Sequence, residues 1–537
     1  MRWNWYWPPT PRRRALRRRV AAFGAGWATS PLRKAGQALG LFAFGALLLH
    51  VLRPETRDAA AAFARREIVD AETFLLLDPL VGTAAALAAR TWHVSLAWAA
   101  AVVAACIVVP RLFCGYVCPL GTLIDLADWA VGRHLRRLHR PAWGRWMRIR
   151  YVVLGAVLAA AAAGTMLAGF AAPIPILTRG MAFVLGPFQS RLMNGADAAT
   201  AAFAGTATGV AILVLILAAT VLGPRFWCRV LCPTGALLSL AARAGLLRRR
   251  ATDRCTHCGE CEAACTFGAI RDDHTTRDAE CTTCQQCGGA CPAGAIDFVV
   301  RPGAAPGATD AATPAAEGLS RRALLVGTAT GLLGGLGAAR AATHSPSHVS
   351  GPPVRPPGSL PEPAFLAACV RCASCIKGCP TGVLVPTGGG HGFNALWTPR
   401  FDADRAGCAP DCAICGQACP TGAIAPLPLE MKRRVSVGLA VVDAATCLPH
   451  AGKADCRLCL DACTAAGYDA IEFILTGVEM DATGAPVEDT GRLAPSVIAD
   501  RCTGCGLCQA ICHRINVREA PTLAASAIVV RAGGQRM

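Results

Sequence analysis

The sequence predicts an α-helical membrane bundle joined to small cysteine-rich α+β domains. Three observations support this: 53% of the 537 residues are apolar while 16% are charged, the apolar residues gather in long runs, and the 29 cysteines fall into short groups. Such a composition is too hydrophobic for an ordinary soluble protein. Cysteines clustered in this number indicate ligands rather than packing residues.

Four apolar runs approach the roughly 20 residues that a helix needs to cross a bilayer. We expect membrane spans at residues 35–52, 91–110, 151–172 and 203–223. The stretches between the first two spans (53–90) and the last two (173–202) are nearly balanced in charge. They are expected to be loops on the outer face.

The net charge of +18 raises the question of a nucleic-acid partner. Residues 1–34 carry nine Lys or Arg and no acid, 111–150 carry eight against two acids, and 224–254 carry seven against one. Residues 341–537, in contrast, carry sixteen of each sign. The positive excess therefore flanks the apolar runs, as cytoplasmic loops do in a multi-pass protein of the bacterial inner membrane. Nucleic-acid binding is excluded.

A repeated motif follows the second and fourth runs. Residues 110–127 read PRLFCGYVCPLGTLIDLA and residues 224–241 read PRFWCRVLCPTGALLSLA. Pro, Arg, both Cys and the following Pro and Gly recur at matched positions, which indicates a duplicated two-span unit with a C-x3-C-P motif. If the halves pack about a pseudo-two-fold axis, four thiols converge near the cytoplasmic face. These expected catalytic residues are Cys114, Cys118, Cys228 and Cys232.

The four thiols could ligate a metal or cluster, or form a redox dithiol pair. The alternative is that they are buried packing cysteines, since free cysteine packs well in apolar surroundings. Repetition at one spacing favours the functional interpretation. Cys106 is unpaired within the second run and is expected to be a core residue.

The other 24 cysteines form six groups of four. Groups with the spacing C-x2-C-x2-C-x3-C are Cys255, Cys258, Cys261, Cys265; Cys281, Cys284, Cys287, Cys291; Cys369, Cys372, Cys375, Cys379; and Cys502, Cys505, Cys508, Cys512. Groups with a longer first gap are Cys408, Cys412, Cys415, Cys419 and Cys447, Cys456, Cys459, Cys463. Three close thiolates suit three corners of a [4Fe–4S] cube, and the fourth usually serves a neighbouring cluster. We therefore expect six [4Fe–4S] clusters.

Groups therefore work in pairs. In the first pair we expect Cys291 to join the first three cysteines of the first group, and Cys265 to join those of the second. Among the last four groups, sequential pairing and an outer pair around an inner pair both stay open. Zinc sites rarely use this ladder, and residues so close in sequence are poorly placed for disulfides. Proline follows the last cysteine in three groups, but Thr266, Thr464 and His513 stand there in the others.

A fifth apolar stretch, residues 323–339, directly follows Ser320, Arg321 and Arg322. Paired arginines before a weakly hydrophobic run are typical of a twin-arginine signal, although a chance pair in an arginine-rich chain is the alternative. Such export moves folded proteins, which suits a domain loaded with clusters in the cytoplasm. Cleavage and retention as a fifth span both stay open.

The expected domains are therefore a basic cytoplasmic N-terminus (1–34), a four-span membrane domain (35–250), a cytoplasmic two-cluster domain (251–300), a linker (301–319), a twin-arginine signal or fifth span (320–341) and a periplasmic four-cluster domain (342–537).

Residues 1 to about 300, with two C-x3-C-P motifs and a bacterial-ferredoxin-like domain, resemble the NapH/MauN-type membrane component of quinol dehydrogenases. The remainder resembles periplasmic ferredoxins of the NapG/MauM type. The resemblance implies a fusion of the two, embedded in membrane lipid. It further implies oxidation of menaquinol or ubiquinol and electron delivery to a periplasmic reductase, such as nitrate reductase, or a cytochrome. The alternative is a copper-reducing assembly factor of the cytochrome oxidase accessory type, or a scaffold whose clusters only stabilise the fold.

Candidates for a quinol site are few. Asp78 lies within an apolar run, where an acid is costly unless used, and could accept a proton or cap a helix before Pro79. His50 and His93 could accept a quinol proton or ligate haem, but interfacial histidines are more common. His391, Phe393 and Trp397 lie in a long loop that could contact a partner or simply wrap its own clusters.

Overall fold

The computed structural model describes residues 4–5, 28–52, 73–92, 94–132, 134–135, 146–194, 206–300, 329–337, 340, 351–478, 487 and 490–533. The chain divides into two compact units, which are described separately. Unit 1 comprises Met1–Leu49, Thr73–Gly180 and Thr208–Ala341. Unit 2 comprises His50–Glu72, Met181–Ala207 and Ala342–Met537.

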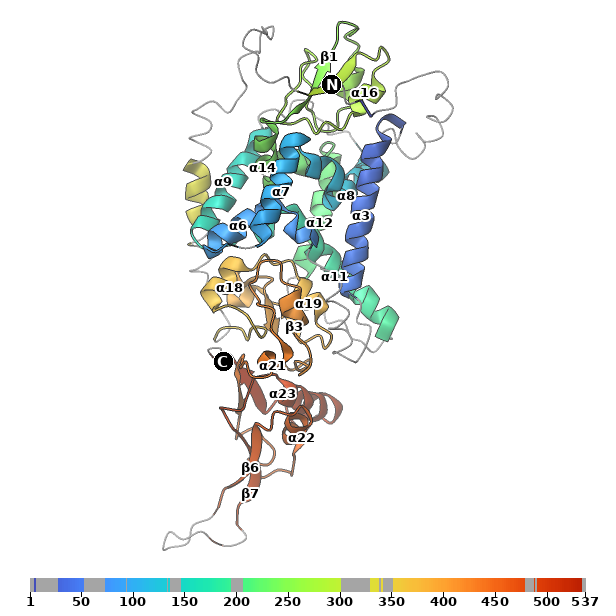
Figure 1. Ribbon diagram of the computed structural model, residues 1–537. Helices are drawn as coiled ribbons and strands as arrows, with labels where there is room; N and C mark the ends of the chain where they lie inside the picture. The colour runs from blue at the N-terminus through green and yellow to red at the C-terminus, as the bar shows by residue number, and fades with distance from the viewer. Residues whose placement is uncertain are drawn as a thin grey trace. The chain divides into compact units, whose positions relative to one another are not determined.

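The first part of the chain is a bundle of mostly short helices (Figure 1). The α-helices are α3 (Pro31–Leu52), α5 (Thr73–Leu76), α6 (Pro79–Ala89), α7 (Val94–Val108), α8 (Pro119–Ala127), α9 (Ile149–Ala162), α10 (Ala168–Ala171), α11 (Pro173–Asn194), α12 (Thr206–Ala218), α13 (Phe226–Val230) and α14 (Pro233–Ala242). Between them lie the π-helical turns η2 (Phe113–Val117) and η3 (Asp128–Gly132) and the 3₁₀ turns η5 (Trp146–Arg148) and η6 (Ala219–Val221).

Helix length does not confirm four membrane spans. Among the described residues, one helix is long and apolar enough to cross a membrane, α3 over Pro31–Leu49. The other expected spans form shorter helices, because α9 ends before Gly164 with a φ of 81° and α12 tightens into η6. These helices are α7, α9 and α12, with 15, 14 and 13 residues.

The stretches 53–90 and 173–202 were expected to be loops, but their described parts contain helices, so this expectation was wrong. α6 is buried against α7, α9 and α14. A Cβ at Gly82 would meet the Ser95 carbonyl oxygen at 2.5 Å, so only glycine permits the close approach of α6 to α7. The apolar run after Asp78 is thus part of the helical core.

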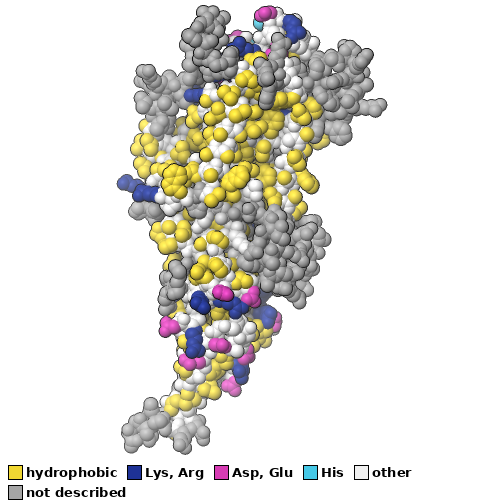
Figure 2. Space-filling view, viewed as in Figure 1, with side chains coloured by type: hydrophobic (Ala, Val, Ile, Leu, Met, Phe, Trp, Pro, Cys, Tyr) yellow, Lys and Arg dark blue, Asp and Glu magenta, His cyan; other side chains and the backbone are white. Residues whose placement is uncertain are grey.

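Apolar side chains also cover much of the outside of the helices in unit 1 (Figure 2). Examples on α3, α7 and α12 are Leu39, Phe42, Val94, Val108 and Leu215, each more than half exposed. An exposed apolar surface of this kind marks contact with lipid or with another protein.

Residues 251–300, together with strand β1, which begins four residues before the expected boundary, form a small module at one end of unit 1, where Figure 1 labels β1 and α16. Strands β1 (Leu247–Ala251) and β2 (Ile296–Val300) pair antiparallel with Leu247 opposite Val300. Helices α15 (Glu260–Ala263) and α16 (Gln286–Ala290) complete the module. Its core contains Phe298 together with cysteines of both groups.

Unit 2 contains two modules of similar construction. The helices are α18 (Glu362–Ala368), α19 (Ser374–Gly378), α20 (Ile414–Gln417), α21 (Leu429–Lys432), α22 (Leu458–Ala465) and α23 (Leu507–Cys512), with 3₁₀ turns η7 (Gly389–His391) and η8 (Phe393–Ala395) and the π-helical η9 (His513–Glu519). The strands are β3 (Leu384–Pro386), β4 (Pro399–Phe401), β5 (Leu439–Val442), β6 (Ile471–Thr476), β7 (Arg492–Val497) and β8 (Ile528–Arg531). They form antiparallel pairs β3–β4, β5–β8 and β6–β7.

The fifth apolar stretch is helical over residues 329–337. Cβ atoms at Gly331 and Gly335 would lie within 2.9 Å of backbone atoms of Ala156 in α9, so this helix packs on α9 through its glycines. Such small-residue spacing allows close helix contact in membranes. Arg321, Arg322 and linker 301–319 lie outside the described residues.

Candidate functional sites

The two C-x3-C-P motifs adopt matching local structures. Arg111 and Arg225 both have left-handed φ values, 54° and 51°. Cys118 and Cys232 both precede the first turn of a helix, α8 and α14, with proline at its first position. Pro fits there because its missing N–H has no partner in the first turn of a helix. The local fold therefore repeats with the sequence.

The two C-x3-C-P motifs also contact one another through their arginines. Arg225 donates from Nη2 to the carbonyl oxygen of Gly121 at 3.3 Å and from Nη1 to that of Cys114 at 3.0 Å. The guanidinium of Arg111 lies in turn against Gly235. Each arginine thus reaches the glycine of the opposite motif, which supports the expected pseudo-two-fold arrangement.

The four motif cysteines share one buried neighbourhood. Burial raises the pKa of Cys228 to about 11, and Cys114 contributes to the rise. Burial also raises the pKa of Cys232, with further contributions from Cys228, Cys114 and Cys118. The structure therefore brings the four thiols together. Cys106 is fully buried in α7, as expected for a core residue.

A buried ion-pair network braces this neighbourhood. Asp125 in α8 accepts hydrogen bonds from Arg225 Nε at 2.7 Å, Arg33 Nη2 at 3.0 Å and Gln37 Nε2 at 2.9 Å. Burial would raise the pKa of Asp125, but Arg225 and Arg33 more than offset this and hold it well below its usual range. The network ties α3, α8 and the second motif together.

The module of residues 251–300 docks directly on the first motif. Tyr116, between Cys114 and Cys118, donates its hydroxyl to the carbonyl oxygen of Thr283 at 2.9 Å. A Cβ at Gly115 would lie 3.2 Å from Thr282 Cβ. Thr282 and Thr283 stand between Cys281 and Cys284, so one cysteine loop of the module touches the C-x3-C-P loop.

Two further contacts fix this docking. Glu280, immediately before Cys281, pairs with Arg111 Nη1 at 3.3 Å and with Arg150. The buried Phe267 ring lies under the guanidinium groups of Arg225, at 4.4 Å from the centroid, and of Arg111, at 5.6 Å. Such cation–π contacts strengthen when the cation is desolvated.

The cysteine loops of the module and of unit 2 share an unusual backbone. In all four C-x2-C-x2-C groups, the residue before the second cysteine and the residue after it have positive φ. These pairs are His257 and Gly259, Thr283 and Gln285, Arg371 and Ala373, and Gly504 and Gly506. Left-handed backbone is costly for residues other than glycine and clusters at functional sites. The same conformation at the same positions indicates that each loop surrounds the same kind of bound group.

The structure brings five sets of four cysteines together. These sets are Cys281, Cys284, Cys287, Cys265 (site 2); Cys369, Cys372, Cys375, Cys419 (site 3); Cys408, Cys412, Cys415, Cys379 (site 4); Cys447, Cys456, Cys459, Cys512 (site 5); and Cys502, Cys505, Cys508, Cys463 (site 6). The set expected from the spacing as site 1 is Cys255, Cys258, Cys261, Cys291, of which Cys261 and Cys291 share one buried core with Cys255 packed against it. Unit 2 therefore pairs its groups sequentially, which the sequence left open.

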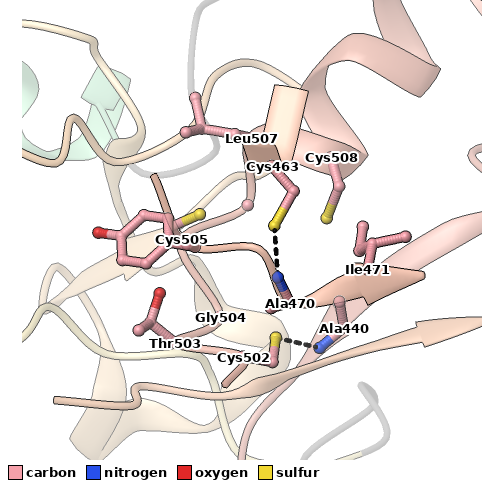
Figure 3. A pocket seen from close by; sticks show the side chains of 12 residues that line it. Ala440, Cys463, Ala470, Ile471, Cys502, Thr503, Gly504, Cys505, Leu507 and Cys508 are labelled. Carbon is pink, nitrogen blue, oxygen red and sulfur yellow. Dashed lines mark hydrogen bonds between the residues drawn. The ribbon is translucent and has the colours of Figure 1, made fainter. Parts of the chain in front are cut away.

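Hollows lie between the cysteines of sites 2, 3 and 6, and all four cysteines of each site line its hollow. Figure 3 shows the four cysteines around the hollow of site 6. Within the described ranges no three His, Cys, Asp or Glu side chains are arranged to hold a single metal ion. A zinc ion would require sulfurs converging at about 2.3 Å, so these sites fit a [4Fe–4S] cube better.

Backbone N–H groups point at the fourth cysteine of several sites. Ala269 donates to Cys265 Sγ at 3.3 Å, and further donors of this kind reach Cys291, Cys419 and Cys463. Burial raises the pKa of Cys281, Cys372 and Cys459 to about 12. Iron binding displaces the thiol proton, and N–H···S bonds tune the cluster potential.

Of the residues that the sequence suggested for a quinol site, Asp78 lies beside the motif cysteines, whereas two histidines lie outside the described residues. Asp78 caps α6 by accepting from the Leu80 N–H at 3.1 Å, and it accepts at 3.0 Å from Oγ1 of Thr234, two residues after Cys232. It is therefore a helix cap that also lies beside the four-thiol neighbourhood. His93 and the side chain of His50 lie outside the described residues. His391 and Phe393 lie on the turns η7 and η8, and Trp397 is buried and lines the hollow of site 3.

Sequence reasoning missed the buried partners of the arginines. Asp125 and Glu280 hold the helices and the module together. Their arginine partners lie about 100 to 170 positions away in the sequence, and no sequence pattern predicts contacts over such separations. The repeated Pro-Arg pair before each motif singles out Arg111 and Arg225, but the sequence does not show which residues these arginines bind.

Comparisons with known proteins agree with the cluster interpretation. A family model described as a 4Fe-4S binding domain matches residues 91–138 and 206–252, which contain the two C-x3-C-P motifs. A second model with the same description matches residues 251–271. No solved structure matches the chain.

Curated relatives are ferredoxin-type proteins. The chain is 36% identical over 183 residues to the methylamine utilization ferredoxin-type protein MauM of Paracoccus denitrificans, covering 34% of this chain and 75% of MauM. It is 34% identical over 190 residues to the ferredoxin-type protein NapG of Escherichia coli, covering 35% and 78%. It is 32% identical over 158 residues to MauN of Paracoccus denitrificans, covering 29% and 48%, so it spans about half of MauN.

Proposed function

The chain belongs to the family of ferredoxin-type proteins that includes MauM and NapG, and on that premise we propose that it is a quinol dehydrogenase. It oxidises a membrane quinol, menaquinol or ubiquinol, and passes electrons through six [4Fe–4S] clusters to a periplasmic redox partner such as a reductase or cytochrome. Bound clusters supply one-electron storage at each site. Oxidation of one quinol releases two electrons and two protons, and the electrons leave one at a time.

The docking of site 2 on the first C-x3-C-P motif is the observation that carries this proposal. Tyr116 and Gly115 lie between Cys114 and Cys118 and contact Thr283 and Thr282 of the site 2 loop. The four-thiol neighbourhood and site 2 are thereby in contact through two short loops. This gives the cytoplasmic sites a role, because the cysteines at the ends of the membrane helices exchange electrons with them.

The residues around the thiols keep this contact dry and fixed. Asp125 holds Arg225 and Arg33, while Glu280 holds Arg111 and Arg150. Asp78 and Thr234 place a buried carboxylate beside the second motif. A quinol proton has an acceptor there if the headgroup reaches this part of the bundle.

The proposed location is the bacterial inner membrane, with several helices in lipid. The exposed apolar side chains on α3, α7 and α12 and the basic loops flanking them support this. Residues 1–34 and 251–300 face the cytoplasm, and residues 342–537 face the periplasm. The helix at residues 329–337 then acts as a retained span connecting the two sides rather than a signal that is removed.

Retention of that helix can be tested by size. The full chain has a mass of 55.6 kDa, and retention predicts this mass for the membrane-bound protein. Gly331→Leu and Gly335→Leu are expected to weaken the contact with α9 and lower the yield of folded protein, whereas Gly334→Leu serves as control because nothing lies within 4 Å of a Cβ there. A separate fragment containing residues 342–537 would contradict retention.

The proposed function is tested by mixing the anaerobically reconstituted full chain with a reduced menaquinol or ubiquinol analogue and following cluster reduction by electron paramagnetic resonance. Wild type is expected to be reduced rapidly, and Cys114→Ala and Cys228→Ala at least tenfold more slowly. Cys106→Ala is the control, because Cys106 is a buried cysteine of the same helical bundle that lies outside the motifs. Failure of both quinols to reduce wild type contradicts the proposal and favours a metal reductase.

A further inference from the structure

The two modules of unit 2 meet at a contact between cysteines of different sites. The N–H of Cys408 in site 4 donates to the carbonyl oxygen of Cys505 in site 6 at 2.8 Å. A hollow beside this contact is lined by both cysteines together with Tyr468, Thr503 and Lys432. Two cluster-holding loops are thus joined by one hydrogen bond.

Close backbone packing fixes this contact. A Cβ at Gly407 would meet Leu507 at 2.6 Å, and one at Gly506 would meet Ala403 at 2.9 Å. Asp404 accepts from Gln509 Nε2 at 2.8 Å, so the segment before Cys408 is also bonded to α23. No side chain other than hydrogen fits at position 407 without pushing the two loops apart.

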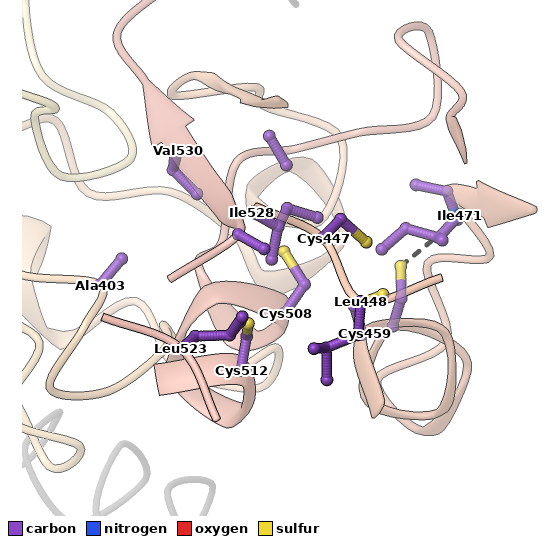
Figure 4. Packing of buried hydrophobic residues seen from close by; sticks show 14 residues of the cluster. Ala403, Cys447, Leu448, Cys459, Ile471, Cys508, Cys512, Leu523, Ile528 and Val530 are labelled. Carbon is purple, nitrogen blue, oxygen red and sulfur yellow. Dashed lines mark hydrogen bonds between the residues drawn. The ribbon is translucent and has the colours of Figure 1, made fainter. Parts of the chain in front are cut away.

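Site 5 adjoins site 6. Cys508 of site 6 and Cys512 of site 5 lie one turn apart on α23, and both belong to the same buried core as Cys447 and Cys459 (Figure 4). Cys379 at the end of α19 belongs to site 4, and its neighbour Cys375 belongs to site 3. These placements link site 3 to 4, 4 to 6, and 6 to 5.

We propose that the four sites of unit 2 form a linear electron path in the order 3, 4, 6, 5, with the Cys408–Cys505 contact as the crossing between modules. This deepens the proposed function and rests on its assignment of [4Fe–4S] clusters to these cysteines. At the crossing one electron leaves the reduced site and reduces the oxidised site on the other side. No bond forms or breaks, and no proton moves with the electron.

A buried lysine sits on the site 4 side of the crossing. Lys432 is 4% exposed, and its Nζ donates to the carbonyl oxygens of Ala409 and Pro410, the latter at 3.2 Å. Both residues belong to the loop between Cys408 and Cys412, which is one residue longer than the regular loops. The positive charge beside site 4 favours its reduced, more negative state. Lys432 is therefore a positioning residue that holds the longer loop and raises the reduction potential of site 4.

The order of sites is tested by magnetic coupling, since two paramagnetic clusters broaden one another's resonance only when close. The full chain is reduced with dithionite, so the result does not depend on quinol. Cys505→Ala removes site 6 and is expected to abolish the broadening of the site 4 resonance by clusters of the second module. Cys456→Ala removes site 5 and is expected to leave this broadening unchanged. The opposite result establishes the order 3, 4, 5, 6 and overturns the proposal.

A second variant keeps every ligand in place. Gly407→Ala is expected to retain the wild-type iron content while weakening the coupling between sites 4 and 6, because the added methyl group separates Cys408 from α23. Unchanged coupling with unchanged iron content overturns the crossing. Loss of quinol reduction with intact coupling would contradict only the quinol proposal.

The role of Lys432 is tested by redox titration of the same chain. Lys432→Met is expected to lower the potential of site 4 alone, and Lys432→Arg to keep it near the wild-type value. Lys453→Met is the matched control, because Lys453 is exposed near site 5. A site 4 potential that Lys432→Met leaves unchanged, or an equal shift at all sites, overturns the tuning role.

Discussion

The module of residues 251–300 and the two modules of unit 2 use the same cysteine motif in different settings. In the first, both loops have the regular spacing and the same left-handed positions, and the module is fixed to helices by buried ion pairs at Glu280. In unit 2 each module combines one regular loop with one longer loop. The residues after Cys412 and Cys456, Ala413 and Arg457, have φ values of −132° and −125° instead of positive values.

A buried polar side chain lies beside each longer loop, as Arg371 does in the regular loop of site 3, where it donates to the carbonyl oxygen of Cys369 at 3.1 Å. Lys432 holds the loop of site 4. Asn516 donates from Nδ2 to Cys456 Sγ at 3.9 Å and to Cys512 Sγ at 3.8 Å in site 5. The two kinds of loop therefore differ in their backbone: the regular spacing has left-handed φ values on both sides of the second cysteine, and the longer spacing does not.

The largest expected effect tests how the first module is fixed. Glu280→Gln leaves the buried Arg111 and Arg150 without their carboxylate, which costs roughly 3–5 kcal/mol when one partner of a buried pair is removed. Native-state hydrogen exchange of residues 251–300 measures the loss as easier opening of the module. Glu262→Gln, at an exposed position in the same module, is the control. Equal protection in both variants would show that the ion pairs do not fix the module.

A pair of alanines isolates the backbone difference between regular and longer loops. Ala373 in site 3 has a φ of 65°, whereas Ala413 in site 4 has a φ of −132°. Replacement by glycine removes the same methyl group at both, but only Ala373→Gly relieves left-handed strain. We expect Ala373→Gly to be less destabilising than Ala413→Gly by about 1–2 kcal/mol. Thermal unfolding of the two variants gives this difference, and equal losses would contradict it.

The smallest expected effect concerns Asn516. Asn516→Leu removes two weak donors to site 5 and is expected to lower the reduction potential of that site by less than Lys432→Met lowers that of site 4, because an amide carries no net charge. Redox titration compares the two directly. A larger shift for Asn516→Leu would contradict the electrostatic explanation.

Cysteine spacing was sufficient to predict the groups, and the resemblance to MauM- and NapG-type proteins is confirmed by the relatives. Spacing could not choose the pairing in unit 2, because that depends on which helices meet: α19 lies against α20, and α22 against α23. The roles of Asp125 and Glu280 could not be predicted either, since their partners are distant in sequence. The stretch that contains α6 was predicted to be a loop from its balanced charge, although Asp78 before Pro79 already offered a helix cap, and α6 is such a helix.

Site 2 is expected to exchange electrons with the four-thiol neighbourhood. Rapid freeze-quench electron paramagnetic resonance after mixing the full chain with a quinol analogue tests it, with the site 2 signal identified by its absence in Cys284→Ala. Early reduction of site 2 is expected in wild type and in Cys106→Ala, and delayed reduction in Cys114→Ala. Reduction of site 2 at the wild-type rate in Cys114→Ala would contradict it.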